Sequence, residues 1–287
     1  MLERISIAVS VLLATMVTAS AFDQTKYPDL TGQWRRGPNT SPAVEARGRG
    51  NMFDPSKGWG PAQQPPLTPE YQARYEANLA EMAKGAPGDM PSWYCLPQGM
   101  PMMMNIYDPM EIVITPGTTH ILVENIRDSR RIFTDGRPWP ERVEESLLGY
   151  SIGQWIDTDG DGKFDLLEVE TRGFTGPRAY DSSGIPLHDD NQTIVKERIY
   201  LDKSDANTLI FDVTVIDNAL TRPWSVHKTY RRQSDPQPQW IEEVCGEGNN
   251  HVQIGRENYM ISGDGLLMPT KKGQRPPDLK YFTRQGQ

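Results

Sequence analysis

Short runs of apolar and β-branched residues, separated by turn residues, follow one another through the middle of this chain. Eight such runs occupy residues 111–115, 120–124, 131–134, 151–156, 166–171, 193–201, 208–216 and 224–230. Runs of this length with partial two-residue alternation predict strands. No helical period intervenes between them, so neighbouring strands are expected to form an antiparallel meander. A meander of this many strands favours a closed barrel, because closure removes the exposed edges of the sheet.

One helix is predicted before the strands, at about residues 69–84. Thr68 is suited to its N-cap, Pro69 to its first position and Gly85 to its end. Apolar residues spaced for one helical face are Tyr71, Tyr75, Leu79 and Met82. We therefore expect a mainly β protein: an antiparallel up-and-down barrel with one N-terminal helix and long loops, the longest at residues 37–67.

The N-terminus has the pattern of a secretory signal peptide. An apolar run at 5–19 precedes Ala19-Ser20-Ala21, the small-x-small pattern of a cleavage site. A membrane anchor is the alternative, but the run is shorter than the ~20 residues that span a bilayer. We expect a signal peptide at 1–21, one barrel domain at 22–264 and a C-terminal arm at 265–287. The mature protein would be periplasmic or secreted, without a stable membrane span.

The net charge limits the partners that can be expected, and the cysteine content limits the possible disulfides. The net charge of −8 offers no basic patch of the kind that nucleic-acid binding needs, so no nucleic-acid partner is expected. The only two cysteines are Cys95 and Cys245. In an oxidising compartment a lone pair of cysteines usually forms a disulfide, which is our prediction, with two buried free thiols as the alternative.

Residues 157–168 match the calcium-binding loop of an EF-hand. Oxygen donors stand at loop positions 1, 3, 5, 9 and 12, with a glycine at position 6. The predicted ligands are Asp157, Asp159, Asp161, the backbone carbonyl of Lys163, Asp165 and Glu168. The flanking segments are strand-like, so we expect a structural calcium ion at a β-hairpin tip. A solvated Asp-Gly turn is the alternative.

Five polar residues are candidates for acid–base catalysis. His188 lies in a loop beside two aspartates and is the first candidate base, because its pKa lies near neutrality. Glu197 and Arg198 are neighbours on one predicted strand and should therefore face opposite sides of it. Arg131 and Asp135 belong to a cluster around one turn, with Arg130 and Arg137. The alternative is that these groups only pair with one another at the surface.

Four methionines follow one another closely after Cys95: Met100, Met102, Met103 and Met104. In an exported protein such a cluster could hold copper(I), since thioethers are soft ligands. The favoured interpretation is an apolar pocket, because methionine adapts to irregular shapes.

Gly32-Gln33-Trp34 resembles the Gly-x-Trp signature of lipocalins and other calycins. The resemblance implies that the tryptophan closes one end of a barrel and that a late arginine, Arg231 or Arg232, packs on it. The wider sequence resembles a large, poorly characterised family of exported bacterial lipocalin-like proteins. Matching stretches lie at residues 28–34, 67–71, 130–140, 149–155, 197–198, 221–224 and 245–249.

This resemblance implies a lipocalin-like barrel and matches the cysteine pairing, but it carries no agreed activity. Relatives usually have a tight Gly-Asp turn where this chain has the acidic loop. We expect a barrel that binds a small hydrophobic or aromatic molecule. The alternatives are a lyase, isomerase or hydratase using acid–base residues in the barrel, and a structural envelope protein.

Overall fold

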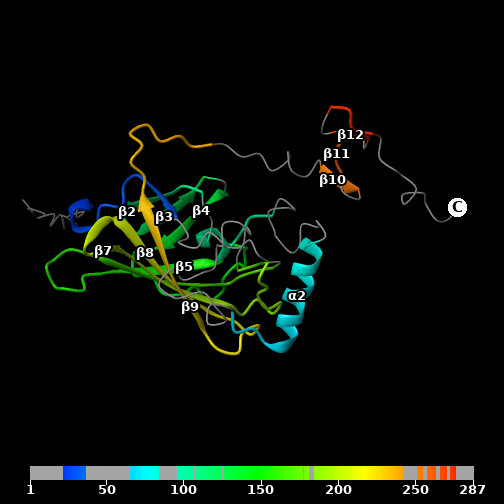
Figure 1. The fold of residues 1–287 in the computed structure, drawn as a ribbon. Coiled ribbons are helices and arrows are strands. Elements are labelled where there is room, and N and C mark those ends of the chain that lie inside the picture. The colour runs from blue at the N-terminus through cyan, green and yellow to red at the C-terminus, as the bar shows by residue number, and fades with distance from the viewer. Residues whose placement is uncertain are drawn as a thin grey trace, which may run out of the picture.

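The computed structural model describes residues 22–36, 65–83, 96–105, 108–124, 126–176, 178–180, 184–241, 251–254, 257–262, 266–269 and 272–275. Nine of its strands form a closed barrel in chain order (Figure 1). They are β1 (Gln33–Arg36), β2 (Met110–Thr115), β3 (Thr118–Val123), β4 (Ile126–Phe133), β5 (Tyr150–Ile156), β6 (Leu166–Arg172), β7 (Ile194–Asp202), β8 (Asp205–Ile216) and β9 (Trp224–Arg232). The prediction of a mainly β barrel is confirmed.

The barrel is mixed rather than wholly antiparallel, which corrects the sequence-based expectation. β4 and β5 run parallel, with Ile132 opposite Ser151 and Phe133 opposite Ile152. Parallel neighbours need a crossover connection of about a dozen residues or more. Residues 134–149 supply it, bringing the chain back alongside the last residues of β4, where β5 begins. The sequence of this connection contains turn residues that also suit an ordinary loop, so it gave no sign of the parallel pairing.

Side chains alternate between the inside and the outside of the barrel along each strand. In β7, for example, Val195, Glu197 and Ile199 are buried while Lys196 and Arg198 are exposed. β-branched and aromatic residues suit such half-buried surfaces, which explains why these segments form strands. The inward side chains of all nine strands form one continuous core.

Trp34 closes one end of the barrel. Its indole nitrogen donates to the carbonyl of Leu30 at 3.0 Å, and the guanidinium of Arg232 lies 4.3 Å from its ring centre. Trp34 and Arg232 face each other where β1 pairs with β9. The expected tryptophan–arginine contact is therefore present, and Arg232 makes it. The loop between β5 and β6 lies at this Trp34 end, since the amide of Phe164 donates to the carbonyl of Lys26.

Helix α2 (Pro69–Ala83) lies beside the opposite end of the barrel, here called the α2 end (Figure 1). Just before it, Leu67 bridges to Leu220 in the loop between β8 and β9. Further along, Asn78 donates to the carbonyl of Gly184, in the loop that leads into β7. The predicted helix is confirmed, and it covers the loops at one end of the barrel.

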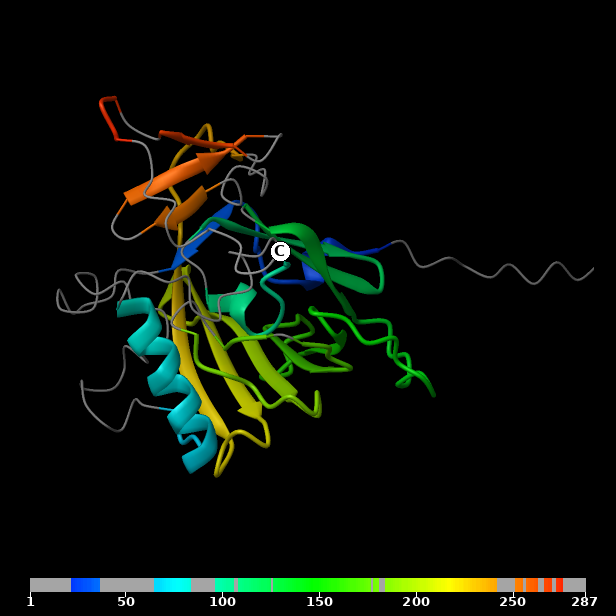
Figure 2. The same ribbon diagram turned by 90° about the vertical axis from the view of Figure 1, so that its right-hand side faces the viewer.

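A second, separate sheet follows the barrel. It contains β10 (His251–Ile254), β11 (Glu257–Ile261) and β12 (Leu267–Pro269), all antiparallel (Figure 2). The sequence analysis did not predict these strands, which are short and carry Gly-rich connections. Two short 3₁₀ helices complete the description: η1 (Gln24–Lys26) and η5 (Met102–Asn105).

Several predictions fall outside the described residues. They are the signal peptide at 1–21, most of the long loop at 37–67, Gly85, Cys95 and Cys245, so the disulfide stays a prediction. Within the part of the chain that the structure describes, no helix is long and apolar enough to cross a membrane.

Candidate functional site

The barrel encloses a buried ion pair between Arg130 of β4 and Glu197 of β7. The two side chains are 1% and 0% exposed. Nη1 of Arg130 donates to Oε1 of Glu197 at 2.9 Å, and Nη2 donates to Oε2. Two parallel bonds of this kind are the strongest arrangement that an arginine and a carboxylate can make.

Two hydroxyl side chains complete this Arg130 network, which consists of Arg130, Glu197, Ser151 and Thr171. Nη2 of Arg130 donates to the Thr171 hydroxyl at 2.9 Å, and Nε reaches the Ser151 hydroxyl at 3.4 Å. The two hydroxyl oxygens are 2.8 Å apart, because Ser151 and Thr171 are opposite each other in the β5–β6 pair. Desolvating such a pair costs about as much as its attraction returns, so it contributes little net stability.

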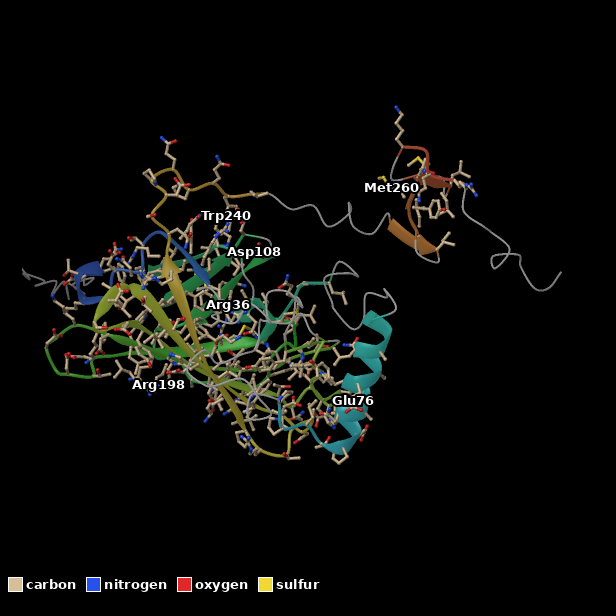
Figure 3. The ribbon with its side chains drawn as sticks, in the orientation of Figure 1. Arg36, Glu76, Asp108, Arg198, Trp240 and Met260 are labelled. Carbon is tan, nitrogen blue, oxygen red and sulfur yellow. The ribbon has the colours of Figure 1, made fainter. Side chains whose placement is uncertain are left out.

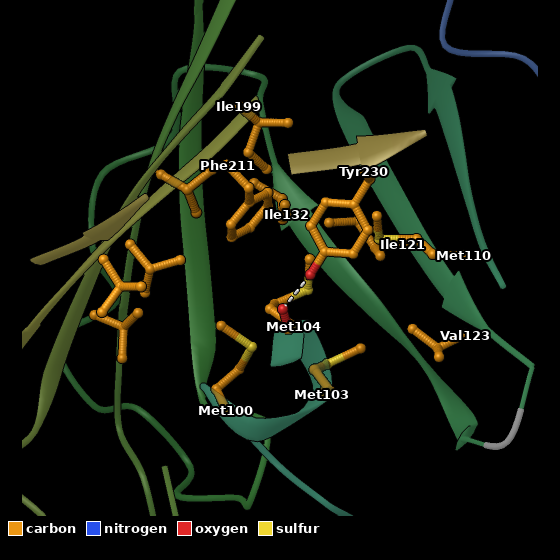
Figure 4. Close-up of a cluster of buried hydrophobic side chains, with 14 of the residues drawn as sticks. Met100, Met103, Met104, Met110, Ile121, Val123, Ile132, Ile199, Phe211 and Tyr230 are labelled. Carbon is orange, nitrogen blue, oxygen red and sulfur yellow. Dashed lines mark hydrogen bonds between the residues drawn. The ribbon is translucent and has the colours of Figure 1, made fainter. Parts of the chain in front are cut away.

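Residues 98–105, here called the methionine segment, fill the barrel interior. Met100, Met102, Met103 and Met104 are each at most 1% exposed. The Tyr230 hydroxyl of β9 donates to the carbonyl of Met104 (Figure 4). Burial raises the pKa of Tyr230 to about 12, so this hydroxyl keeps its proton at neutral pH.

His188 lies in a separate cluster at the α2 end. Its Nδ1 is 3.0 Å from Oδ1 of Asp190, and its ring centre is 5.0 Å from that of Tyr71 on α2. Burial alone would raise the pKa of Asp190, but hydrogen bonds from Gln192 and Asn218 and the nearby His188 lower it. The backbone amide of His188 donates to Asp217. His188 and Glu197 therefore belong to two different groups of contacts.

The other three candidate residues, Arg131, Arg198 and Asp135, face outward. Arg131 is exposed on β4. Arg198 also faces solvent (Figure 3), and its Nε lies 3.3 Å from Oε1 of Glu168. Asp135 accepts two bonds from the Arg137 guanidinium, which lowers the pKa of Asp135 to about 2. Arg198 and Asp135 therefore belong to surface pairs, and Arg131 faces solvent.

Glu197 and Arg198 lie on opposite faces of β7, as the two-residue strand period predicts. The same rule, applied to β4, would have identified Arg130 as the inward arginine, because it shares a face with buried Ile132. The turn cluster contains both Arg130 and Arg131, and the candidate chosen from it, Arg131, is the one that faces outward. Ser151 and Thr171 carried no chemical signal in the sequence, since hydroxyl residues are common on both faces of strands.

A second histidine–aspartate pair lies on the outer face of the barrel. Nδ1 of His227 is 2.6 Å from Oδ1 of Asp212, and the Tyr200 hydroxyl donates to Oδ2 of Asp212 at 3.0 Å. Strand register brings these residues together, because Asp212 of β8 is opposite His227 of β9. Their positions are far apart in the sequence, so no local motif indicated the pair.

Three of the predicted calcium ligands converge at the Trp34 end. Carboxylate oxygens of Asp157, Asp159 and Asp161 lie within 4.8 Å of one another. The Asp157 carboxylate also accepts the backbone amides of Gly160 and Gly162, at 2.7 and 2.9 Å. This arrangement fits a hard cation, which prefers carboxylate oxygens.

The remaining predicted carboxylates are engaged by other groups. Asp165 accepts the amide of Thr158 at 2.9 Å, and Glu168 pairs with Arg198 on the outer face of the sheet. Nζ of Lys203 lies 3.8 Å from Asp159 and 3.9 Å from Asp165. The loop therefore presents three converging carboxylates and one nearby amine, rather than a complete EF-hand ligand set.

No family model and no curated protein sequence matches this chain. Its function is therefore argued from the geometry of the barrel and its loops.

Proposed function

We propose that this chain is an exported barrel protein that binds a small, mainly apolar molecule inside the barrel, between the methionine segment and the Arg130 network. The observation that carries this proposal is the Arg130–Glu197 pair, fully buried in a mainly apolar interior that also holds Lys228 of β9. Apolar cavities with a few well-placed polar groups are the usual form of small-molecule sites. The polar groups fix the orientation of the ligand.

The energetic balance of the pair supports a functional role. Replacing a buried ion pair by apolar residues of similar volume is often neutral or stabilising, so stability alone does not favour the pair. A ligand with a hydroxyl or carbonyl group would gain hydrogen bonds from Ser151, Thr171 or the guanidinium of Arg130.

The methionine segment supports the same proposal. Unbranched thioether side chains repack easily around ligands of irregular shape. Met100, Met103 and Met104 form part of the core, next to Tyr230 (Figure 4). A ligand would bind by displacing these side chains from the interior.

The proposal is tested with N-phenyl-1-naphthylamine, a neutral apolar dye that fluoresces when it leaves water. Wild-type protein should bind the dye with micromolar affinity. Met103→Trp fills the interior and should weaken binding at least about tenfold, because an overfilled core resists further insertion. Met268→Trp is the control, since Met268 lies on β12, outside the barrel, and is exposed.

Circular dichroism of both variants verifies that the barrel is folded. Equal affinity of the two variants for the dye would contradict an internal site, as would the absence of any fluorescence gain with wild-type protein. Native mass spectrometry of protein purified from its own host gives an independent readout, because a retained small molecule would appear as added mass.

We further propose that the loop at 157–168 binds calcium and stiffens the β5–β6 hairpin. The convergence of Asp157, Asp159 and Asp161 supports this second role. A bound calcium ion would screen the repulsion among these carboxylates. Binding should appear as heat in calorimetric titration and as a rise in Tm with calcium.

Asp159→Asn with Asp161→Asn should abolish both signals, whereas Asp235→Asn, an exposed aspartate after β9, should change neither. Lys203→Gln should raise the calcium affinity, because the amine competes for Asp159. Wild-type protein that releases no heat at millimolar calcium would refute the site.

A further inference from the structure

Arg178, in the loop between β6 and β7, is a buried cation with few partners. Only 8% of the residue is exposed, and its guanidinium lies 4.6 Å from the ring centre of Phe174. Nη2 donates to the Thr193 hydroxyl at 2.9 Å. Nε and Nη1 are buried and have no hydrogen-bond partner among the described residues. Buried arginines are normally paired with a carboxylate, so this arrangement is incomplete by itself.

Among the described residues, Asp217 has the largest electrostatic effect on Arg178. Its carboxylate accepts the hydroxyl of Thr193 and the amides of His188 and Ala219. The hydrogen-bonded path from Arg178 to Asp217 therefore runs through Thr193. Burial lowers the pKa of Arg178 to about 10, although Asp217 and Asp190 oppose this effect. The guanidinium thus remains charged at neutral pH while it lacks the water that would normally solvate it.

Two buried acceptors at the same end also lack partners. Oδ1 of Asn105 and Oε1 of Gln98, both in the methionine segment, accept no hydrogen bond from any residue that the structure describes. Asn105 is tied to the Arg178 loop, because its amide nitrogen donates to the carbonyl of Tyr180 at 2.8 Å. An unsatisfied acceptor of the methionine segment, Oδ1 of Asn105, therefore lies where this segment meets the Arg178 loop.

This region adjoins the proposed internal site. Thr193, Val195 and Glu197 are all buried and alternate along one face at the start of β7. Arg178 contacts the first of them and Arg130 the last. The rings of Tyr180 and Trp224, 4.6 Å apart, provide an apolar surface beside this position.

We propose that Arg178 binds the carboxylate of the ligand, so that the ligand class is an organic acid with an apolar body. This inference rests on the proposed function and specifies its substrate. A single negative charge balances a single guanidinium. A phosphate dianion suits the position less well, because Asp217 and Asp190 lie close enough to repel a second negative charge.

The test compares decanoate with 1-decanol, which have the same chain length but differ in charge, as competitors of the dye. Decanoate should displace it from wild-type protein at about tenfold lower concentration, the gain expected from a hydrogen-bonded charge. Arg178→Gln should remove this difference between decanoate and decanol. Arg222→Gln, an exposed arginine between β8 and β9, is the matched control and should keep the difference.

Equal competition by decanoate and decanol on wild-type protein overturns the inference and leaves the internal site standing. An undiminished decanoate preference in Arg178→Gln also overturns it.

If the dye does not bind, calorimetry with decanoate separates the two proposals. Heat that depends on Arg178 supports the carboxylate site alone, and no heat refutes both. The wild-type comparison needs no variant, so poor folding of Arg178→Gln leaves the test intact. Stronger binding of inorganic phosphate than of decanoate would contradict the proposed ligand class.

Discussion

A charged side chain inside the barrel should affect stability more than a residue of the same type on the surface. Glu197 and Glu168 are both glutamates paired with arginines, Glu197 inside the barrel and Glu168 on its surface. The solvent around the second pair screens its charges and can replace its hydrogen bonds. The buried pair has no such alternative, so the same substitution should have very different effects at the two positions.

Glu197→Gln should lower the free energy of unfolding by about 3–5 kcal/mol, because it leaves the buried Arg130 guanidinium without its counterion. Glu168→Gln should cost less than about 1 kcal/mol. Urea unfolding measures both values. The double variant Arg130→Met with Glu197→Met should recover much of the loss, since it removes both charges. Equal losses from the two single variants would contradict the buried pair.

Tyr230 should make the protein sensitive to alkali. Its folded pKa of about 12 lies above the ordinary value of 10.0, so the proton stabilises the folded state below pH 10. As pH rises further, the unfolded chain loses this proton first, and stability falls by about 1.4 kcal/mol between pH 9 and pH 11. Urea unfolding at these two pH values should show a smaller fall for Tyr230→Phe. An unchanged fall would show that other groups cause the alkaline sensitivity.

Among the strand pairs of the barrel, β4 and β5 form the parallel one. It depends on how residues 134–149 leave β4 and bring the chain back beside its last residues. Gly149 directly precedes β5 and has a φ of 68°, and a Cβ there would lie 2.7 Å from the Phe174 ring and 2.8 Å from the Arg172 carbonyl. The start of β5 is therefore fixed by close backbone approach as well as by strand pairing.

Gly149→Ala should destabilise the protein by about 2–5 kcal/mol, combining left-handed backbone strain with overpacking. Gly136→Ala is the control, because Gly136 has a similar φ of 76° and no atom within 4 Å of its added Cβ. That variant should cost only about 1–2 kcal/mol, from backbone strain alone. Thermal unfolding of the two proteins measures the difference, and similar Tm values would contradict the crowding at Gly149.

Most individual elements could be predicted from local pattern, and their pairing could not. The alternation of apolar residues predicted the strands, and Pro69 indicated the start of α2. Hairpins such as β2–β3 follow from a Pro-Gly turn between two runs. The β4–β5 pair depends on a crossover between separated segments, for which short runs carry no signal. The β10–β12 sheet consists of local hairpins, but its strands are too short for their apolar pattern to indicate them.

For the whole molecule, the sequence predicts an exported chain with one disulfide between cysteines that are far apart in the sequence. The mass of protein purified from its host should correspond to a chain that begins at Phe22. Cys95 and Cys245 should resist alkylation until a reductant is added, because the predicted disulfide blocks both thiols. Modification of both cysteines without reduction would disprove the disulfide, and a mass that includes residues 1–21 would disprove cleavage.

The sequence by itself determined that this chain is a β protein with one helix, because strand and helix periods are local properties of the residues. It also determined which loop concentrates acidic side chains. Only the tertiary structure decided that Arg130 meets Glu197, that His188 lies elsewhere, and that Arg178 is buried with no carboxylate paired to it among the described residues. These facts depend on which strands become neighbours and on which face each side chain occupies. A closed barrel sets both through its global register, which no short segment encodes.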